Sequence, residues 1–345
     1  MRYRELGGTG VKVSELCLGT MTFGQQNTES EGFAQIDRAL EAGVNFIDTA
    51  EMYPVPPSGD TAGRTEKIIG NWLRKSGRRQ DVVLATKVIG NGKWMPHIRD
   101  GKSRPDRENI LQALEGSLQR LQTEYIDLYQ IHWPDRETNY FGRLGYSPTA
   151  EDSSLAIDAT LKALGEIVSS GKVRFVGVSN ETPWGVMQYL LGSDGLDLPR
   201  IVSIQNPYNL LNRSFEVGLA EISHREKVGL LAYSPLAFGT LSGKYLEARP
   251  ENARLSLFPD YARYTKPEGV AATRAYVELA RNLGLSPAQM ALAFINSRPF
   301  VTSAIIGATT LTQLDENLDS INLNLDHETI REIDEIHQRN SNPCP

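Results

Sequence analysis

Short runs of apolar and β-branched residues recur along the chain, and amphipathic stretches separate them. Between the runs, apolar residues such as Phe33, Ile36 and Leu40 follow a helical period. Strands that alternate with helices form parallel sheets, and eight such units make an α/β fold of the (β/α)8, or TIM, barrel class. The sequence contains eight runs: Leu16–Thr20, Asn45–Ala50, Val82–Val88, Tyr125–His132, Val173–Asn180, Ile201–Pro207, Gly229–Leu236 and Thr302–Gly307. The pattern therefore predicts a (β/α)8 barrel.

The segments outside the eight runs have patterns of their own. Residues 4–16 form two short segments around a glycine-rich centre, which predicts an N-terminal β-hairpin that covers one barrel end. Residues 325–338 carry Ile330, Ile333 and Ile336 among charged neighbours, which predicts a helix packed on the outside. The sequence has no interdomain linker and no internal repeat, so we expect residues 1–345 to form a single domain.

Three connections are long and rich in glycine, proline and charge: 89–106, 133–152 and 237–270. Each follows a predicted strand, and loops in that position lie on the C-terminal face, where barrel enzymes keep their active sites. We expect these loops to build a pocket; disordered insertions are the alternative.

Composition and charge narrow the class of protein. With 40% hydrophobic and 23% charged residues the chain is typical of a folded protein with a large core. A formal charge of −6 does not indicate the basic surface that binders of nucleic acid or anionic membranes usually have, so we expect neither as a partner. The residues after Met1 lack the apolar stretch of a signal peptide, and Cys17 and Cys344 are the two cysteines, so we expect the cytoplasm. The five histidines show no metal-ligand spacing, and we expect no metal.

Two glycine-rich segments resemble nucleotide-binding motifs without matching them. Gly8 and Gly10 have Val13 where a dinucleotide fingerprint needs its third glycine, and no strand precedes them, so a hairpin turn explains them better. Residues 239–244 lack the P-loop spacing. Their glycines and Lys244 still suit another phosphate group.

Four polar residues lie at or just beyond the C-terminal ends of three successive predicted strands: Asp48, Tyr53, Lys87 and His132. Taken singly, each has a structural explanation, such as a turn cap, a packed ring or a satisfied core histidine. Lys87 and Asp48, however, fall within apolar runs, where unpaired charges are costly and have to be paired. A cluster of Lys, Asp and Tyr on one face predicts a proton-transfer site.

These residues also carry a resemblance to a known family. The chain resembles the aldo-keto reductase superfamily in residues 43–53 (GVNFIDTAEMY), in Thr86-Lys87 and in residues 127–133 (DLYQIHW), and the likeness extends to the helix near Asn317. It implies that Tyr53 donates a proton to a substrate carbonyl while a nicotinamide cofactor delivers hydride. It also implies that Lys87 lowers the pKa of Tyr53 from about 10 towards working pH, that Asp48 holds Lys87, and that His132 orients the substrate oxygen.

The resemblance further implies a cofactor site in the second half of the barrel. Ser179, Asn180 and Gln205 would bind the nicotinamide carboxamide, and Tyr233 would stack on the ring, although packing alone also explains Tyr233. Residues of the 234–244 loop would cover the pyrophosphate, and residues of the last strand end would bind the adenosine phosphate and adenine. These two groups are Ser234, Pro235, Leu236, Gly239, Leu241, Gly243 and Lys244, and Gly307, Thr309, Gln313, Glu316 and Asn317.

The choice between NADPH and NADH rests on one departure from the family pattern. Position 310, where many relatives carry Arg or Lys towards the 2′-phosphate, is Thr310. Arg254 is a candidate for the missing charge, with a solvated surface arginine as the alternative. We expect NADPH/NADP⁺, with NADH possible.

The substrate is expected to be a small carbonyl compound. Candidate pocket walls are Phe23, Met52, Trp94 and Trp133, for each of which core packing is the alternative. Four basic residues of the 89–106 loop are candidates for attracting an acidic substrate, with loop solubility as the alternative: Lys93, Arg99, Lys102 and Arg104. A nicotinamide-binding regulatory or sensor protein is the alternative to an enzyme, and the sequence carries no trace of the oligomeric state.

Overall fold

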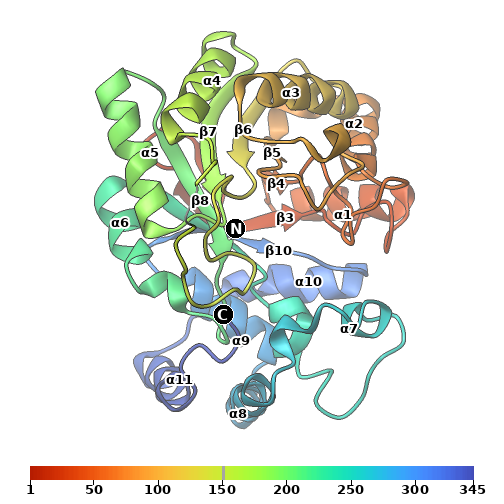
Figure 1. Cartoon of the computed structure of the whole chain (residues 1–345). Coiled ribbons are helices and arrows are strands. Elements are labelled where there is room, and N and C mark those ends of the chain that lie inside the picture. Colours follow the sequence, from red (N-terminus) through yellow and green to blue (C-terminus); the bar gives the residue numbers. More distant parts are fainter. Residues whose placement is uncertain (150–151) are drawn as a thin grey trace.

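Eight parallel strands close into a barrel at the centre of the molecule (Figure 1). The structure is a computed structural model that describes residues 1–149 and 152–345. Neighbours around the barrel follow the order β10-β3-β4-β5-β6-β7-β8-β9. The strands are β3 (Leu16–Gly19), β4 (Phe46–Asp48), β5 (Val83–Val88), β6 (Ile126–Ile131), β7 (Val173–Ser179), β8 (Ile201–Pro207), β9 (Gly229–Tyr233) and β10 (Val301–Ile306). Each overlaps one of the eight predicted runs, so the (β/α)8 prediction is confirmed.

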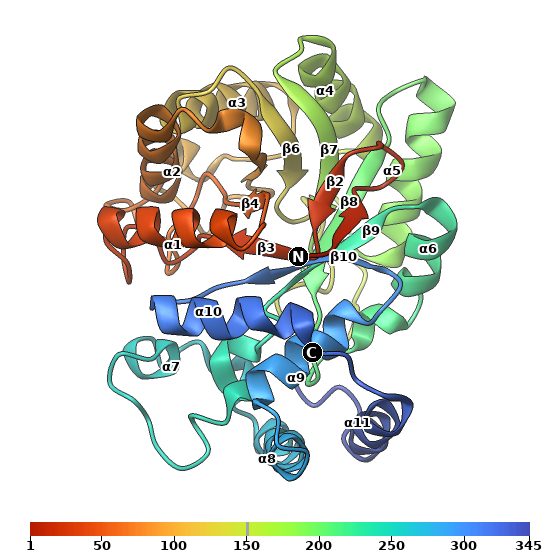
Figure 2. The same ribbon diagram turned by 180° about the vertical axis from the view of Figure 1, so that it is seen from behind.

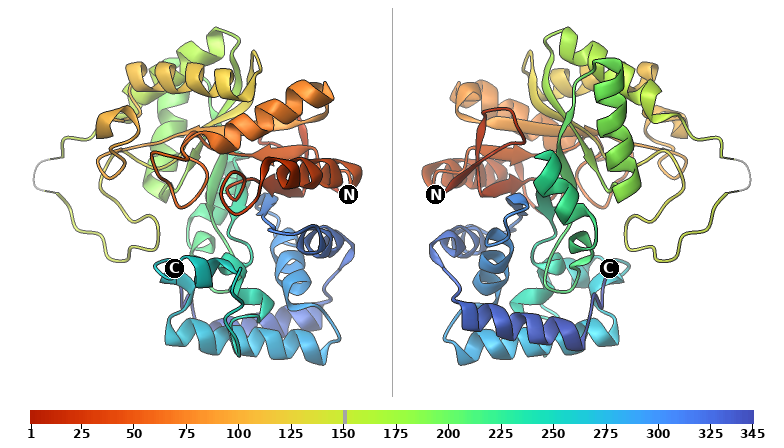
Figure 3. Two further views of the ribbon diagram at one scale, coloured as in Figure 1. Left: turned by 90° about the vertical axis from the view of Figure 1, so that its right-hand side faces the viewer. Right: turned by 90° about the vertical axis from the view of Figure 1, so that its left-hand side faces the viewer.

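Helices surround the barrel as an outer layer (Figure 1). Helix α1 shows how the sequence builds this layer: Thr28 and Glu31 form a capping box at its start, and Ile36 and Ala39 are buried on its inner side. The helices are α1 (Glu29–Glu41), α2 (Arg64–Ser76), α3 (Arg107–Leu121), α4 (Ile157–Ser169), α5 (Pro183–Leu196), α6 (Leu219–Glu226), α7 (Arg254–Leu257), α8 (Pro267–Asn282), α9 (Pro287–Asn296), α10 (Leu311–Asp319) and α11 (His327–Arg339). Helix α11 is the helix predicted after the last strand, and it runs beside α8 (Figure 3). Among the described helices, none is both long enough and apolar enough to span a membrane.

The predicted N-terminal hairpin covers the end of the barrel where the strands begin, as Figure 2 shows from behind. It consists of β1 (Tyr3–Glu5) paired antiparallel with β2 (Lys12–Ser14). Leu6 and Val13 are fully buried and pack with barrel residues such as Phe46 and Leu128. The hairpin therefore keeps water out of the lower barrel interior.

The barrel interior has an apolar layer below a polar one. Alternate residues of a strand face the same side, so each strand can contribute to both layers. Phe46 and Leu128 belong to the apolar cluster near the hairpin. Two residues further along their strands, Asp48 and Gln130 are buried as well, and they share a hydrogen bond. This alternation explains why charged and amide residues occur within otherwise apolar strands.

The long connections leave the ends of the strands on the opposite face from the hairpin. The first contains the short 3-10 helix Arg99–Gly101. The third contains the 3-10 helices Ala237–Ser242 and Ala262–Tyr264 with α7 between them. The second predicted connection, 133–152, includes two residues that lie outside the described residues.

Candidate active site

A buried ion pair lies where β4 and β5 run side by side. The Nζ atom of Lys87 donates to Oδ2 of Asp48 and to the backbone oxygen of Thr49, both at 2.7 Å. Burial alone would lower the pKa of Lys87, but the charge of Asp48 and the nearby Tyr53 outweigh burial and raise it. Lys87 is therefore charged. It is also paired with Asp48, as expected for a charge within an apolar strand.

Two glutamine side chains complete the surroundings of Asp48. Oδ1 of Asp48 accepts from Nε2 of Gln205 at 2.8 Å and from Nε2 of Gln130 at 3.4 Å. Gln205 was expected to bind the nicotinamide carboxamide, but in this structure its amide nitrogen is engaged by Asp48. Gln130 was not identified from the sequence. The available signal was an amide residue inside an apolar run, two positions before His132.

The rings of Tyr53 and His132 meet edge to face in front of this network. Their centroids are 5.8 Å apart, and Lys87 Nζ lies 4.9 Å from the centroid of Tyr53. Burial lowers the pKa of His132 well below its ordinary value, and the charge of Lys87 lowers it further. His132 is therefore neutral at physiological pH.

The expected direction of the Tyr53 pKa shift is wrong for this structure. Burial raises the pKa of Tyr53, and the opposing effect of Lys87 is too small to reverse the shift. Tyr53 thus keeps its proton up to alkaline pH. A protonated phenol is the state that a proton donor needs.

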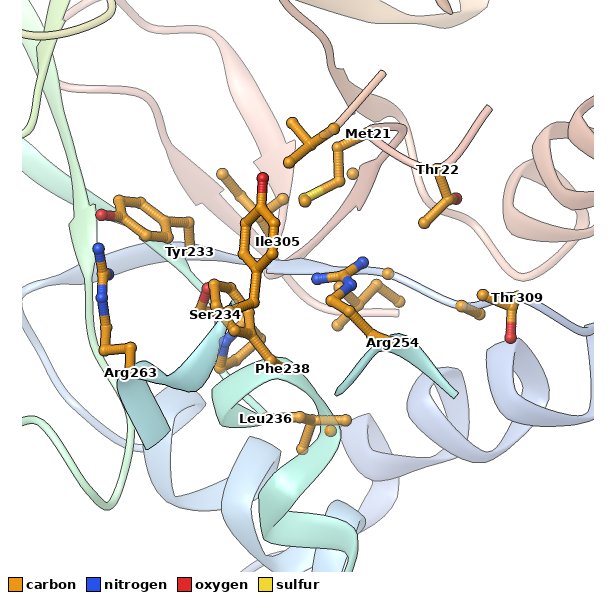
Figure 4. Close-up of a pocket in the computed structure, with 18 of the residues that line it drawn as sticks. Met21, Thr22, Tyr233, Ser234, Leu236, Phe238, Arg254, Arg263, Ile305 and Thr309 are labelled. Atoms are coloured by element: carbon orange, nitrogen blue, oxygen red, sulfur yellow. The ribbon is translucent and has the colours of Figure 1, made fainter. Parts of the chain in front are cut away.

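A cavity of about 1060 Å³ adjoins this group of residues, and Figure 4 shows part of its lining. Asp48, Tyr53 and His132 line it, and Lys87 lies behind Asp48 with no exposed surface. Of the predicted cofactor residues, these also line the cavity: Ser179, Asn180, Gln205, Tyr233, Ser234, Pro235, Leu236, Gly239, Lys244, Arg254, Gly307, Thr309, Gln313, Glu316 and Asn317. Leu241 and Gly243 do not line the cavity, because Leu241 is buried in the core and Gly243 packs beside Val277.

Hydrogen bonds fix the residues at the ends of β7 and β9. The hydroxyl of Tyr233 donates to Oδ1 of Asn180 at 2.7 Å, and Nδ2 of Asn180 donates to the backbone oxygen of His132 at 2.9 Å. The hydroxyl of Ser179 donates to the backbone oxygen of Gln205 at 2.7 Å. Asn180 adopts a left-handed backbone with φ of 53°, a conformation that asparagine tolerates better than most residues. This network links the cofactor side of the cavity to His132.

Two cations stand close together at the other side of the cavity, Lys244 and Arg254. Burial lowers the pKa of Lys244, and the neighbouring charge of Arg254 lowers it further. Burial also lowers the pKa of Arg254. The turn before Lys244 has positive φ at Phe238 and Gly239. A Cβ at Gly239 would lie 3.0 Å from Lys244 Nζ, so glycine leaves room for the lysine.

The start of α10 forms the far end of the cavity. Gln313 Oε1 accepts from both the backbone nitrogen and the hydroxyl of Thr309, each at 3.1 Å. Asn317 Nδ2 donates to the backbone oxygen of Gly307 at 3.2 Å. Thr310, at the position where the family resemblance suggested a basic residue, caps α10 by accepting from the backbone nitrogen of Gln313.

Aromatic side chains form a wall beside His132. Trp133 lies 4.9 Å from His132, 5.2 Å from Trp94 and 5.7 Å from Phe141, measured between ring centroids. Met52, Trp94 and Trp133 line the cavity as expected. Phe23 does not, because it is fully buried in the core against α1 and α2.

The basic residues of the first long loop are partly neutralised within the protein. Arg99 forms a two-pronged ion pair with the buried Glu51, at 2.6 and 2.7 Å. Arg104 pairs with Asp135 at 2.6 Å. These two arginines therefore hold the loops in place. A different arginine, Arg263, lines the cavity and was not identified from the sequence.

Comparison with known proteins defines the class of this chain. A sequence profile of the Aldo/keto reductase family matches residues 15–338, so the chain belongs to that family. Membership makes the chain an oxidoreductase, and nicotinamide cofactors are general in the family. The chain is 52% identical to Protein tas of Escherichia coli (strain K12) over the whole of both chains. This agrees with the segments 52–57 and 203–212, whose sequences look like the bacterial Tas protein.

Two further relatives are more distant. The chain is 35% identical to the uncharacterized oxidoreductase YrpG of Bacillus subtilis, over 97% of this chain and 96% of that protein. It is also 35% identical to an aldo-keto reductase of Babesia bovis, over 76% of this chain and 98% of that protein.

Proposed function

We propose that this protein reduces small aldehydes or ketones to alcohols with NADPH as the reductant and Tyr53 as the proton donor. The observation that carries the proposal is the position of Lys87, which is held 2.7 Å from Asp48 and 4.9 Å from the Tyr53 ring. A buried ammonium beside a phenol stabilises the tyrosinate that remains after proton transfer.

The residues of the cavity fit a nicotinamide dinucleotide. Lys244 and Arg254 line the cavity and form no ion pair with any of residues 1–149 and 152–345. Two neighbouring cations without carboxylate partners favour phosphate groups. Ser179, Asn180, Gln205 and Tyr233 would then hold the nicotinamide end, and residues 307–317 the adenosine end. When bound, the reduced nicotinamide supplies a hydride to the carbonyl carbon.

The protein's own residues account for the proton. The hydroxyl of Tyr53 gives its proton to the carbonyl oxygen as negative charge develops there. Lys87 stabilises the resulting tyrosinate, and Asp48 keeps Lys87 charged and in place. Neutral His132 sits beside Tyr53 and orients the substrate oxygen with a ring nitrogen. The aromatic wall of Trp94, Trp133 and Phe141 offers an apolar surface beside the reacting centre.

Arg254 supports NADPH over NADH. Thr310 caps a helix and brings no charge, so the 2′-phosphate needs a cation from elsewhere. Arg254 points into the cavity (Figure 4), where its Cζ lies 5.4 Å from the centroid of the Phe238 ring. Its guanidinium is planar and matches a phosphate with two hydrogen bonds.

Two further proposals concern the cell compartment and the domain organisation. Cys17 and Cys344 are buried and not joined in a disulfide, which supports a reducing compartment such as the cytoplasm. We also propose that residues 1–345 work as one barrel domain, because segments from both ends of the chain line the cavity.

The test is oxidation of NADPH at 340 nm with a reactive aromatic aldehyde, comparing the wild type with Tyr53→Phe and repeating the assay with NADH. We expect the substitution to abolish turnover while NADPH binding, followed by quenching of protein fluorescence, is retained. Tight NADPH binding without turnover of any carbonyl compound would favour the sensor alternative instead. Failure to bind any nicotinamide nucleotide would overturn the proposal.

A further inference from the structure

The cavity contains two cationic side chains that the proposed function does not use. Four cationic side chains line it, namely Lys244, Arg254, Arg263 and Lys266, and none of them pairs with a carboxylate of the described residues. The proposed function uses Lys244 and Arg254 for phosphates. Lys266 is exposed at the rim. Arg263 therefore remains as a partly buried cation without an assigned partner.

Acidic residues of the cavity do not neutralise Arg263. Asp48 is paired with Lys87. Glu251 and Asp260 are exposed to water. Glu316 lies at the adenosine end and accepts a hydrogen bond from Ser286 at 2.6 Å. The C-terminal residue Pro345 also lines the cavity, and its carbonyl oxygen lies 3.0 Å from the position that a Cβ on Gly142 would take, close to Arg263. Within the part of the chain that the structure describes, the guanidinium nevertheless has no carboxylate, the C-terminal one included, within 4.0 Å.

Arg263 is held on the side of the cavity that faces Tyr233. Figure 4 shows its guanidinium beside the hydroxyl end of the Tyr233 ring, whereas Arg254 lies towards Thr309. Its Cζ is 6.0 Å from the centroid of Tyr264, and its Nε lies 3.1 Å from the position that a Cβ on Gly142 would take. The guanidinium thus lies where the second and third long loops meet. Burial alone would lower the pKa of Arg263, but the phenol groups of Tyr233 and Tyr264 outweigh burial and raise it.

Tyr233 connects this cation to the reacting centre. Burial is the largest cause of its raised pKa, and both Arg263 and Tyr53 are close enough to shift that pKa as well. Tyr53, Tyr233 and Arg263 line the same cavity, so a molecule whose anionic group binds Arg263 can extend past Tyr233 to Tyr53. The aromatic wall of Trp94, Trp133 and Phe141 offers a flat apolar surface for the rest of that molecule.

We propose that Arg263 binds a carboxylate of the substrate, so that the preferred substrates are aldehydes or ketones with a flat apolar body and an ionised acid at the opposite end. A planar guanidinium matches a carboxylate with two parallel hydrogen bonds, and a partly buried cation gains from an anionic partner. This proposal rests on the proposed function, because it assumes that the carbonyl is reduced at Tyr53. It adds the class of substrate to that function.

The test compares a charged substrate with a neutral one of the same shape. We would measure kcat/KM with NADPH for 4-carboxybenzaldehyde and for its methyl ester, in the wild type and in Arg263→Met. We expect the substitution to lower kcat/KM for the acid by about tenfold to a hundredfold, mainly through KM, and to leave the ester within about twofold. Arg263→Lys should restore only part of the loss, because an ammonium lacks the planar fork.

A matched control removes an equal charge from the same cavity. Lys266→Met takes away an exposed cation at the rim. We expect it to change kcat/KM by no more than about twofold for either the acid or the ester. Equal losses for the acid and the ester in Arg263→Met would show a structural role and overturn the proposal. A loss of the acid preference in Lys266→Met that matches the loss in Arg263→Met would overturn it too, since general attraction would then suffice.

A binding measurement separates this proposal from the proposed function. Titration calorimetry with terephthalate, which has no reducible carbonyl, should show weaker binding to Arg263→Met than to the wild type or Lys266→Met. If no aldehyde is turned over but terephthalate binding depends on Arg263, the proposed function is wrong, whereas carboxylate binding at Arg263 is supported. If aldehydes are reduced but terephthalate binds equally to all three proteins, carboxylate binding at Arg263 is contradicted and the proposed function is not. Arg263→Lys serves both measurements if Arg263→Met does not fold.

Discussion

The Nζ atom of Lys87 lies 2.7 Å from Oδ2 of Asp48, and the two side chains are 0% and 4% exposed. Each charge is therefore tolerable only because the other is present, as removal of one partner leaves an uncompensated buried charge. The same pair faces Tyr53. The Asp48–Lys87 pair therefore affects both the stability of the barrel and the proton transfer proposed for Tyr53.

Asp48→Asn should lower both stability and activity. The substitution keeps the size of the side chain but leaves the Lys87 ammonium without its counter-ion, and we expect the free energy of unfolding to fall by about 3–5 kcal/mol. Urea unfolding followed by circular dichroism measures this change. Asp81→Asn breaks the exposed ion pair with Arg78 and serves as the control, with an expected loss below about 1 kcal/mol. Similar losses in the two variants would contradict the account of the buried pair.

His132 should make the protein less stable in mild acid. Its pKa is lowered in the folded state, so below about pH 6.5 the unfolded chain takes up a proton that the folded chain does not. This contribution to stability is therefore present above pH 6.5 and is lost as pH falls towards the folded-state pKa, by up to about 1.4 kcal/mol per pH unit.

The measurement is the free energy of unfolding between pH 5 and 7.5, compared between the wild type and His132→Gln. We expect the variant to have the shallower slope. His224→Gln, at an exposed histidine of α6, should keep the slope of the wild type. An unchanged slope in His132→Gln would mean that His132 binds a proton in the folded protein.

Most of the fold was predictable because local patterns determine it. Strands of a parallel barrel are buried on both sides, so they occur as continuous apolar runs, and all eight were found this way. The hairpin and α11 were found from the same kind of pattern. The polar residues of the barrel, such as Asp48 and Lys87, stood out because charge is rare within such runs.

Contacts between distant segments were not predictable. Arg99 is neutralised by Glu51 and Arg104 by Asp135, partners 48 and 31 positions away in sequence. Phe23 follows a strand end, as the true wall residues do, yet it turns into the core. Arg263 lies in a loop without a motif, and only the fold brings it beside Tyr233. Such features depend on how loops pack, and a single sequence does not specify that packing.

Arg254→Leu should reduce the preference for NADPH over NADH. If Arg254 binds the 2′-phosphate, its loss removes charge-assisted hydrogen bonds, and we expect KM for NADPH to rise about tenfold to a hundredfold with little change for NADH. Initial rates with each cofactor at a fixed aldehyde concentration measure both constants. Arg249→Leu, an exposed arginine of the same loop, is the control and should leave both constants unchanged. A parallel rise of both constants would assign Arg254 to a part common to the two cofactors.

Trp94→Ala should weaken the binding of aromatic substrates. Trp94 is 52% exposed although it contacts Trp133 at 5.2 Å, so one part of its surface is available to a ligand in the cavity. Aromatic contacts contribute about 0.5–1.5 kcal/mol beyond area burial, which predicts a rise in KM of about threefold to tenfold for aromatic aldehydes. Small aliphatic aldehydes should show a much smaller change, because they are too short to reach the indole. Trp184→Ala, at a 58% exposed tryptophan of α5 outside this cavity, is the matched control. An equal rise for aromatic and aliphatic aldehydes would show that Trp94 supports the loop and does not contact the substrate.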